Sequence, residues 1–198
     1  MIGVCVAYRP PGHAAHVLDV AGVTADRARL APVSLWRGLG SIRADRFAGW
    51  GRGVVAPAAG TVVAVHDGEP DRPAMSLLRD VPRVLLIGPL RAGRNLAAAA
   101  GNHVVLELSG GFVLLAHLRR GSAAVAAGDR VAPGDPLGEV GNSGNSLAPH
   151  LHVQAMTSAD PFTASVLPWR VDRLERLDDG GWRPAAGPVP LRVPVRSP

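Results

Sequence analysis

The sequence contains no lysine and only one cysteine, so all 21 of its basic residues are arginines. Without lysine, the chain cannot form a lysine Schiff base, use a P-loop lysine or carry a biotinyl- or lipoyl-lysine. Because Cys5 is the only cysteine, an internal disulfide and a cysteine-based metal cluster are also excluded. Any bound metal must therefore be held by His, Asp or Glu.

Aromatic residues and long apolar runs are scarce as well. Aromatics make up 4% of a chain that is 47% apolar, so the core must consist of Val, Leu and Ala. No run reaches the ~18 apolar residues of a membrane span. The first eight residues lack the basic region and long apolar stretch of a signal peptide. As written, the sequence therefore reads as cytoplasmic, with no transmembrane span and no visible export signal.

The net charge of +5 would suit an acidic polymer such as nucleic acid or an anionic cell wall. The arginines are scattered, however, and few aromatics are present to stack on bases. We therefore expect no nucleic-acid partner.

The chain has 198 residues, which fits one domain, and its 24 Gly and 18 Pro separate short runs rich in Val and Leu. This pattern predicts an all-β fold of short antiparallel strands and hairpins, a sandwich or barrel. The clearest expected strands are 60–66, 103–108, 112–118, 136–140 and 150–156. A hairpin turn is expected at Ser109-Gly110-Gly111 between two of them.

Two segments break the strand pattern. Residues 67–101 are rich in Arg, Pro and Ala and weakly periodic, so we interpret them as a long inserted loop with a short helix near 74–79. Residues 183–198 are Pro-rich without periodicity and predict an extended or disordered tail. The expected organisation is a domain over 1–182, carrying the insertion 67–101, followed by this tail.

Two of the seven histidines lie in the run His150-Leu151-His152. On a strand, residues i and i+2 point to the same face, so both imidazoles project side by side. Burying two unpaired polar rings is costly, and a metal ion or a cleft would supply their partners. The alternative is a pair of surface histidines on an edge strand. A Gly/Asn-rich loop, Gly141–Ser146, leads tightly into this strand.

Two further elements supply possible ligands. His117 stands in a second apolar strand, where a histidine is commonly a hydrogen-bonded core residue. Near the start, His13, His16 and Asp19 offer two imidazoles and a carboxylate, although the segment alone could be a solvated loop. Zinc favours nitrogen and oxygen ligands and keeps one position for water at catalytic sites. One of these histidines, Asp19 and one histidine of the 150–152 pair would complete a His2Asp site.

In their order, these pieces resemble the lysostaphin/LytM-type zinc metallopeptidases. The resemblance covers roughly residues 13–156 and is strongest from Gly128 to His152. Its further motifs are the Val-x-Ala-Pro-x-x-Gly-x-Val hairpin at 54–62, the Gly-Asn-x-Val-Val strand at 101–105 and the Gly-Asp-x-Val-x-x-Gly-x-x-Leu-Gly-x-Val-Gly-Asn-Ser-Gly stretch at 128–144. The resemblance implies the duplicated hybrid motif, a barrel-sandwich hybrid, and a zinc endopeptidase acting on peptidoglycan peptides in the cell envelope or outside the cell.

The resemblance also implies roles for the matched residues. Asp19 and His152 would bind zinc together with a histidine of the first element, while His117 and His150 would be catalytic. The first element departs from the commonest family spacing, His-x-x-x-Asp, because His13 is six residues before Asp19 and His16 is three. We expect His13 to be the ligand, with His16 as the alternative.

The remaining polar residues have simpler interpretations. His66 and Asp67, followed by Asp71, form a possible metal pair for which a structural or loop-capping role is favoured. His103 is expected to be structural. A catalytically inactive LytM-like module, binding cell wall or regulating a partner, is the alternative function. A biotinyl- or lipoyl-like carrier shares the 128–138 pattern but is excluded by the missing lysine. We expect a monomer, and the sequence does not name the bond cleaved.

Overall fold

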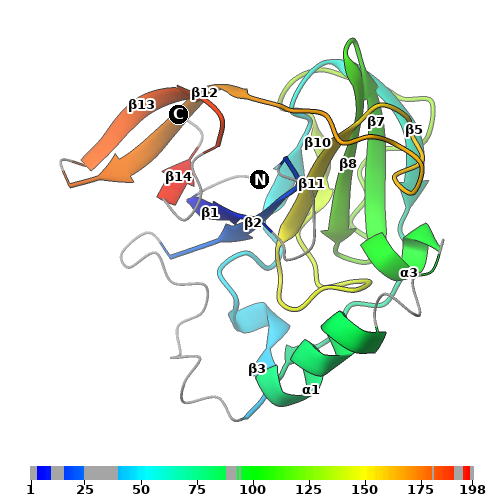
Figure 1. Cartoon of the computed structure of the whole chain (residues 1–198), viewed down its shortest axis with the longest axis vertical. Coiled ribbons are helices and arrows are strands. Elements are labelled where there is room, and N and C mark those ends of the chain that lie inside the picture. The colour runs from blue at the N-terminus through cyan, green and yellow to red at the C-terminus, as the bar shows by residue number, and fades with distance from the viewer. Residues whose placement is uncertain are drawn as a thin grey trace.

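The structure is a computed structural model, and it describes residues 4–9, 16–24, 40–87, 93, 95–179, 181–189 and 194–196. Its largest element is a ten-stranded sheet in the order β13-β12-β14-β1-β2-β11-β8-β7-β5-β9, with antiparallel pairing throughout. The strands of this sheet are β1 (Cys5–Tyr8), β2 (Leu18–Gly22), β5 (Gly60–His66), β7 (Asn102–Leu108), β8 (Gly111–Leu118), β9 (Arg130–Val131), β11 (Leu151–Met156), β12 (Val171–Asp178), β13 (Gly181–Gly187) and β14 (Pro194–Arg196). The predicted all-β, antiparallel fold is confirmed (Figure 1).

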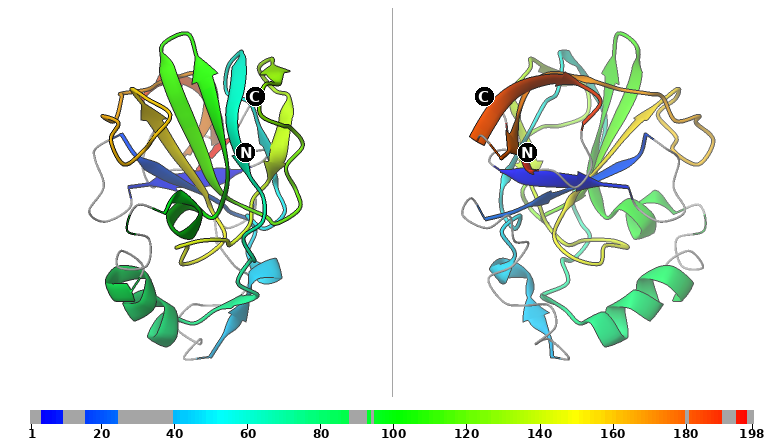
Figure 2. Two further views of the ribbon diagram at one scale, coloured as in Figure 1. Left: turned by 90° about the vertical axis from the view of Figure 1, so that its right-hand side faces the viewer. Right: turned by 60° about the vertical axis from the view of Figure 1, so that its left-hand side comes forward.

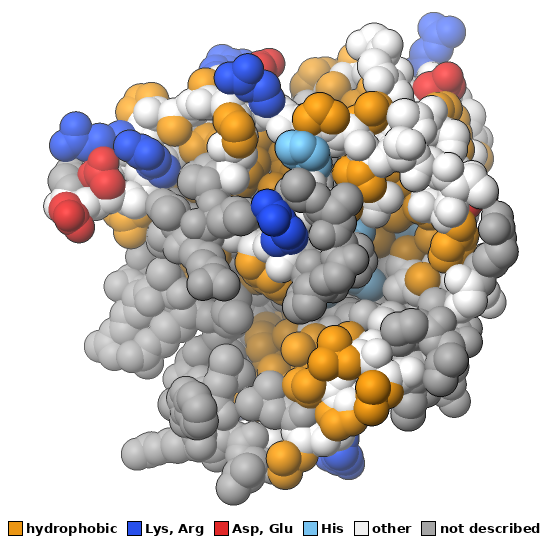
Figure 3. Space-filling view, viewed as in Figure 1, with side chains coloured by type: hydrophobic (Ala, Val, Ile, Leu, Met, Phe, Trp, Pro, Cys, Tyr) orange, Lys and Arg blue, Asp and Glu red, His pale blue; other side chains and the backbone are white. Residues whose placement is uncertain are grey.

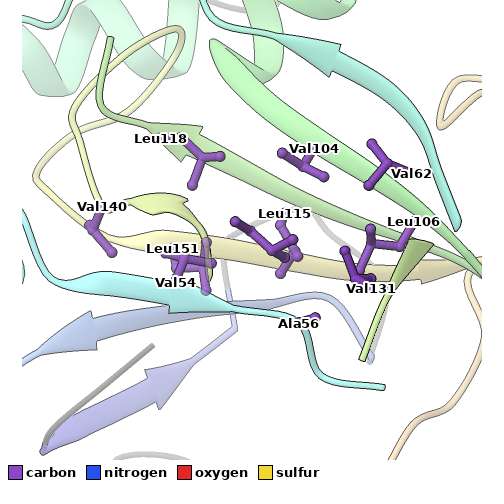
Figure 4. Close-up of a cluster of buried hydrophobic side chains, with 11 residues drawn as sticks. Val54, Ala56, Val62, Val104, Leu106, Leu115, Leu118, Val131, Val140 and Leu151 are labelled. Carbon is purple, nitrogen blue, oxygen red and sulfur yellow. The ribbon is translucent and has the colours of Figure 1, made fainter. Parts of the chain in front are cut away.

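A second layer packs against the centre of this sheet. It is the pair formed by β4 (Gly53–Val55) and β10 (Pro136–Glu139). Between the layers, Val54 and Leu137 meet fully buried side chains of the large sheet such as Leu106 and Leu118 (Figure 4). As the composition requires, this core consists of Val, Leu and Ala. The five expected strands and the Ser109-Gly110 turn are all present, within a residue or so at their ends.

The insertion is more structured than the expected loop. Its described residues form β6 (Ala74–Met75), α1 (Leu77–Pro82), the π-helical turn η3 (Arg83–Ile87) and α3 (Leu96–Ala100). The helix expected near 74–79 begins later because β6 pairs with β3 (Ile42–Arg43) and buries Met75. It begins after Ser76, whose backbone N–H donates to the Asp80 carboxylate at 2.6 Å. Figures 1 and 2 show α1 below the large sheet, at the end of the molecule that also holds β3.

Residues 183–198 were expected to be an extended or disordered tail after a domain over 1–182, and their described part lies mostly in strands. The boundary falls inside β13, and β14 pairs with both β1 and β12. Cys5, Leu174 and Val195 form a small core there, and the Arg196 guanidinium lies over the Trp182 ring. The pairing of β14 with β1 joins Cys5 to Val195, 190 positions apart, so local periodicity does not reveal it. Pro184 fits because β13 is the terminal strand of the sheet order, and terminal strands tolerate proline.

No helix in the described part of the chain is long and apolar enough to cross a membrane.

Candidate active site

Four of the five residues predicted for the site come together on three neighbouring strands. β11 lies between β2 and β8, and its His152 is paired with Asp19 on one side and with Ala116 on the other. His150 immediately precedes β11, and His117 follows Ala116 in β8. All four side chains are buried or nearly so. The pairing of β2 with β11 thus joins the first element of the sequence to the His-x-His element.

The Asp19 carboxylate touches two histidines. Its Oδ1 lies 2.8 Å from Nδ1 of His152, and its Oδ2 lies 3.3 Å from Nε2 of His150. Burial alone would raise the pKa of Asp19, but His150 and His152 outweigh burial and hold that pKa well below its usual value. Asp19 is therefore an anion in a buried place, where an unpaired carboxylate would be unfavourable.

His117 reaches this cluster because β8 is bulged. The register with β7 shifts between the pairs Asn102–Leu118 and His103–Ala116, leaving His117 as the extra residue. Its φ is 63°, which is unusual for a residue other than glycine. On a regular strand His117 would share the face of Leu115, which belongs to the central core. The bulge instead places its ring 4.7 Å from that of His150 and 5.8 Å from that of His152, centroid to centroid.

The loop Gly141–Ser146 and the residues that follow it, up to Ala148, fix the orientation of both catalytic candidates. Nδ1 of His117 donates to the Ser143 carbonyl at 2.9 Å, and Nδ1 of His150 donates to the Ala148 carbonyl at 2.7 Å. Ser146 Oγ also lies 3.3 Å from Nδ1 of His150. Since a carbonyl only accepts, both rings carry their proton on Nδ1 when neutral, and Nε2 is left for chemistry.

The pKa values of His117 and His150 are shifted in opposite directions. The pKa of His117 is lowered well below its ordinary value by burial, reinforced by the neighbouring His150 and His152. Burial would also lower the pKa of His150, but contact with the Asp19 carboxylate outweighs burial and raises it. Two adjacent imidazoles with opposite tendencies suit a proton acceptor paired with a proton donor.

The loop itself is anchored by buried polar contacts. Ser143 Oγ donates to the Leu118 carbonyl at 2.7 Å and accepts from the Asn102 N–H at 3.0 Å. The backbone N–H of Asn142 donates to Asp71 at 2.6 Å, which supports the loop-capping role expected for Asp71. Gly144 has a φ of +65°, and a Cβ there would come within 2.3 Å of the Gly101 nitrogen. The anchoring role of Ser143 was not predicted from the sequence.

Tyr8, the only tyrosine, also belongs to this site and was missed. It pairs with Asp19 across β1 and β2, and its ring centroid is 6.3 Å from that of His150. Burial, with the Asp19 charge as a smaller contribution, raises its pKa so far that it stays protonated. Its position in a short apolar start gave no indication of this, because only the pairing of β1 with β2 brings it to the cluster.

The first element is described only in part. His13 lies outside the described residues, and His16 is exposed with its carbonyl accepting from Trp169 Nε1 at 2.9 Å. Among the described residues, no group of three or more His, Cys, Asp or Glu side chains is arranged to hold a metal ion. Asp19 and His152 are thus the two predicted ligands that the structure places together.

The other histidines are arranged structurally. His66 and His103 face each other across β5 and β7 with ring centroids 5.7 Å apart, and Nδ1 of His103 donates to the Gly101 carbonyl at 2.8 Å. Asp67 accepts from the backbone N–H groups of Gly121 and Ala123. These contacts agree with the structural and loop-capping roles expected for them.

Comparison with known proteins gives one family match. Residues 84–164 match the model of Peptidase family M23, a segment that contains His117, His150 and His152 but not Asp19. No match was found among curated protein sequences.

Three solved structures match this chain over 55–83% of its length. One is the catalytic domain of a mutant of the prophage-encoded M23 protein EnpA from Enterococcus faecalis, at 15% identity over 83% of this chain and 88% of that one, with a TM-score of 0.46. The catalytic domain of the antimicrobial peptidase lysostaphin from Staphylococcus simulans has 20% identity over 83% and 88%, with a TM-score of 0.44. A zinc-containing peptidase from Vibrio cholerae has 22% identity over 55% of this chain and 24% of that one, with a TM-score of 0.36.

Proposed function

We propose that this chain, whose residues 84–164 match the model of Peptidase family M23, is a zinc metalloendopeptidase of the lysostaphin/LytM type that hydrolyses peptide bonds of bacterial peptidoglycan. The family match supports a peptidase, and the metal, the substrate and the activity of the site are our proposal. The observation that carries it is the buried cluster of Asp19, His117, His150 and His152.

The donor set fits zinc. The Asp19 carboxylate and Nδ1 of His152 lie 2.8 Å apart, and oxygen and imidazole nitrogen are ligands that zinc favours. The anionic state of Asp19 is also the state that binds a metal. His13, or His16 in its place, is the third ligand of the proposal. A zinc ion held there would lower the pKa of water and polarise the scissile carbonyl.

The two other histidines would move the protons. Nε2 of His117, left unprotonated by burial and by the Nδ1 contact to Ser143, would accept the proton of the attacking water. Nε2 of His150, which faces the Asp19 carboxylate, would donate to the developing oxyanion or to the leaving amine. No glutamate base is required for this division of roles.

The runner-up is a catalytically inactive module of the same fold that binds cell wall or regulates a partner. The unusual spacing of the first element favours it, as does the exposed position of His16. Both functions place the protein in the cell envelope or outside the cell, where peptidoglycan lies, and we propose that location with the function.

The test is digestion of purified peptidoglycan, followed by the release of free amino groups. We expect a chelator to abolish the activity and added zinc to restore it. His117→Ala and His150→Ala should each lower the activity at least about a hundredfold, the lower range for loss of a general acid or base. His66→Ala is the matched control, because it removes a histidine outside the cluster. Hydrolysis that persists in chelator, or in both cluster variants, would contradict the proposal.

A further inference from the structure

The insertion exposes an unusual amount of apolar surface. Of the large hydrophobic side chains in the described part of the chain, four are exposed, and three of them lie within 77–87. Leu78 is 65% exposed, Leu85 57% and Leu86 68%, whereas the fourth, Phe162, is 37% exposed and lies elsewhere. Single exposed hydrophobics are ordinary, but three in one helical run indicate a contact surface.

These leucines share one side of the run formed by α1 and η3. Leu78, Pro82, Leu85 and Leu86 are spaced i, i+4, i+7 and i+8, the spacing of one helix face, and all four are exposed. We call these four residues the leucine face. Figure 3 shows hydrophobic side chains gathered over α1, on the face of the molecule turned to the viewer.

The charges of this run are divided between its two sides. Asp80, its only acidic residue, is turned inward, where it pairs with Arg72 at 2.7 Å. Arg83 is partly buried and donates to the Ser146 carbonyl at 3.1 Å. Arg79 remains exposed next to Leu78. The outer side therefore offers apolar side chains and a positive charge, and no carboxylate.

The leucine face is too small to be a stable dimer interface. A helical run of 11 residues is about 16 Å long and about 10 Å wide, so two copies would bury a few hundred Å² at most. Stable protein interfaces bury at least about 1,200 Å² in total. A narrow apolar strip bordered by arginine is instead the pattern of helices that lie in a membrane surface, with their apolar side among acyl chains and their basic side chains on anionic headgroups.

We propose that the leucine face docks on the surface of an anionic lipid membrane. The docking does not depend on the peptidase proposal, because lipid binding is measured without any hydrolysis. It would nevertheless place the histidine cluster near the membrane. The run contacts the Gly141–Ser146 loop through Arg83 and through Asn145, whose side-chain amide donates to the Val84 carbonyl at 3.3 Å.

The test is co-sedimentation of the full chain with lipid vesicles. We expect partitioning onto phosphatidylglycerol/phosphatidylcholine vesicles to exceed that onto pure phosphatidylcholine at least about fivefold. The reason is that each basic residue near the surface is attracted to the anionic headgroups. The triple variant L78S/L85S/L86S should bind at least about tenfold more weakly, because burial of these three leucines among the acyl chains contributes most of the binding. Phe162→Ser, the matched control, should bind as the native chain does.

A second variant distinguishes a specific loss of binding from misfolding of the triple variant. Arg79→Glu keeps the leucines and should lower binding to the anionic vesicles about fivefold or more, with an unchanged melting temperature. The proposal is overturned by equal sedimentation with and without vesicles, or by equal losses in Phe162→Ser and the triple variant. It is also overturned if light scattering shows a dimer that the triple substitution dissociates, because the face would then bind a second copy.

Discussion

Gly144→Ala tests whether the loop that orients His117 depends on a close backbone approach. Gly144 has a φ of +65°, in the left-handed region that costs other residues roughly 1–2 kcal/mol. A Cβ there would also meet three backbone atoms, the Gly101 nitrogen at 2.3 Å, the Gly101 Cα at 2.7 Å and the Ala100 carbonyl carbon at 2.9 Å. Backbone atoms cannot change rotamer as a side chain can, so the segments that hold Gly144 and Gly101 must move apart.

The expected cost follows from these two effects. Overpacking typically costs about 1–3 kcal/mol, so we expect Gly144→Ala to lower the free energy of unfolding by ~2–5 kcal/mol in total. Gly121→Ala is the matched control, because Gly121 has a φ of +74° and a methyl group added there would meet no atom within 4 Å. It should cost only the backbone part, roughly 1–2 kcal/mol.

The assay is urea denaturation of both variants, with activity measured on the folded protein. Because Gly144 follows Ser143, whose carbonyl holds Nδ1 of His117, Gly144→Ala should also lower kcat while Gly121→Ala leaves it unchanged. Equal unfolding free energies for the two variants, within about 0.5 kcal/mol, would refute the close-approach argument.

Three other predictions concern the surroundings of the site. Leu106→Ala should lower the free energy of unfolding by about 2–5 kcal/mol, measured by urea denaturation, because Leu106 is fully buried between the two layers. Asp80→Asn should lower the free energy of unfolding by about 1–3 kcal/mol in the same assay, because it leaves the half-buried Arg72 without its anion. Asp45→Asn, which breaks the exposed pair of Asp45 with Arg43, is the control, and an equally small effect of Asp80→Asn would contradict the prediction. His103→Asn should destabilise the protein most above pH 7 and less as the pH falls below about 6.5. Because burial lowers the pKa of His103, protons bind more tightly to the unfolded chain than to the folded one. Falling pH therefore lowers the free energy of unfolding of the chain that has His103, while the Asn variant lacks this effect. A difference in unfolding free energy that stays constant from pH 7.5 to 5.5 would show that His103 is not buried as a neutral ring.

The central strands could be predicted from the sequence because their information is local. Alternating Val and Leu runs between Gly and Pro set β5, β7, β8 and β11, and the i, i+2 spacing put His150 and His152 on one face. No strand was predicted at Leu18–Gly22, so the pairing of β2 with β11 was not predicted either. It is the register of these two strands that brings Asp19 to His152.

The features that could not be predicted depend on how strands pair with one another. The bulge at His117 arises from its register with β7, whereas a regular strand would have turned this side chain into the core. Tyr8 enters the site through β1, and β14 returns from the end of the chain to pair with that same strand. The helix of the insertion begins two to three residues later than its composition suggested, because Met75 is taken into a strand pair. Each of these outcomes is decided by pairing with another strand rather than by the local sequence pattern.

The most direct test of the account is the zinc content of the purified protein, measured by elemental analysis after incubation with zinc and removal of the excess. The native chain and His66→Ala should each hold about one zinc, and Asp19→Ala and His152→Ala should hold none. Comparing His13→Ala with His16→Ala would identify the third ligand. A native chain that retains no zinc, or an Asp19→Ala variant that retains as much as the native chain, would contradict the proposed metal site.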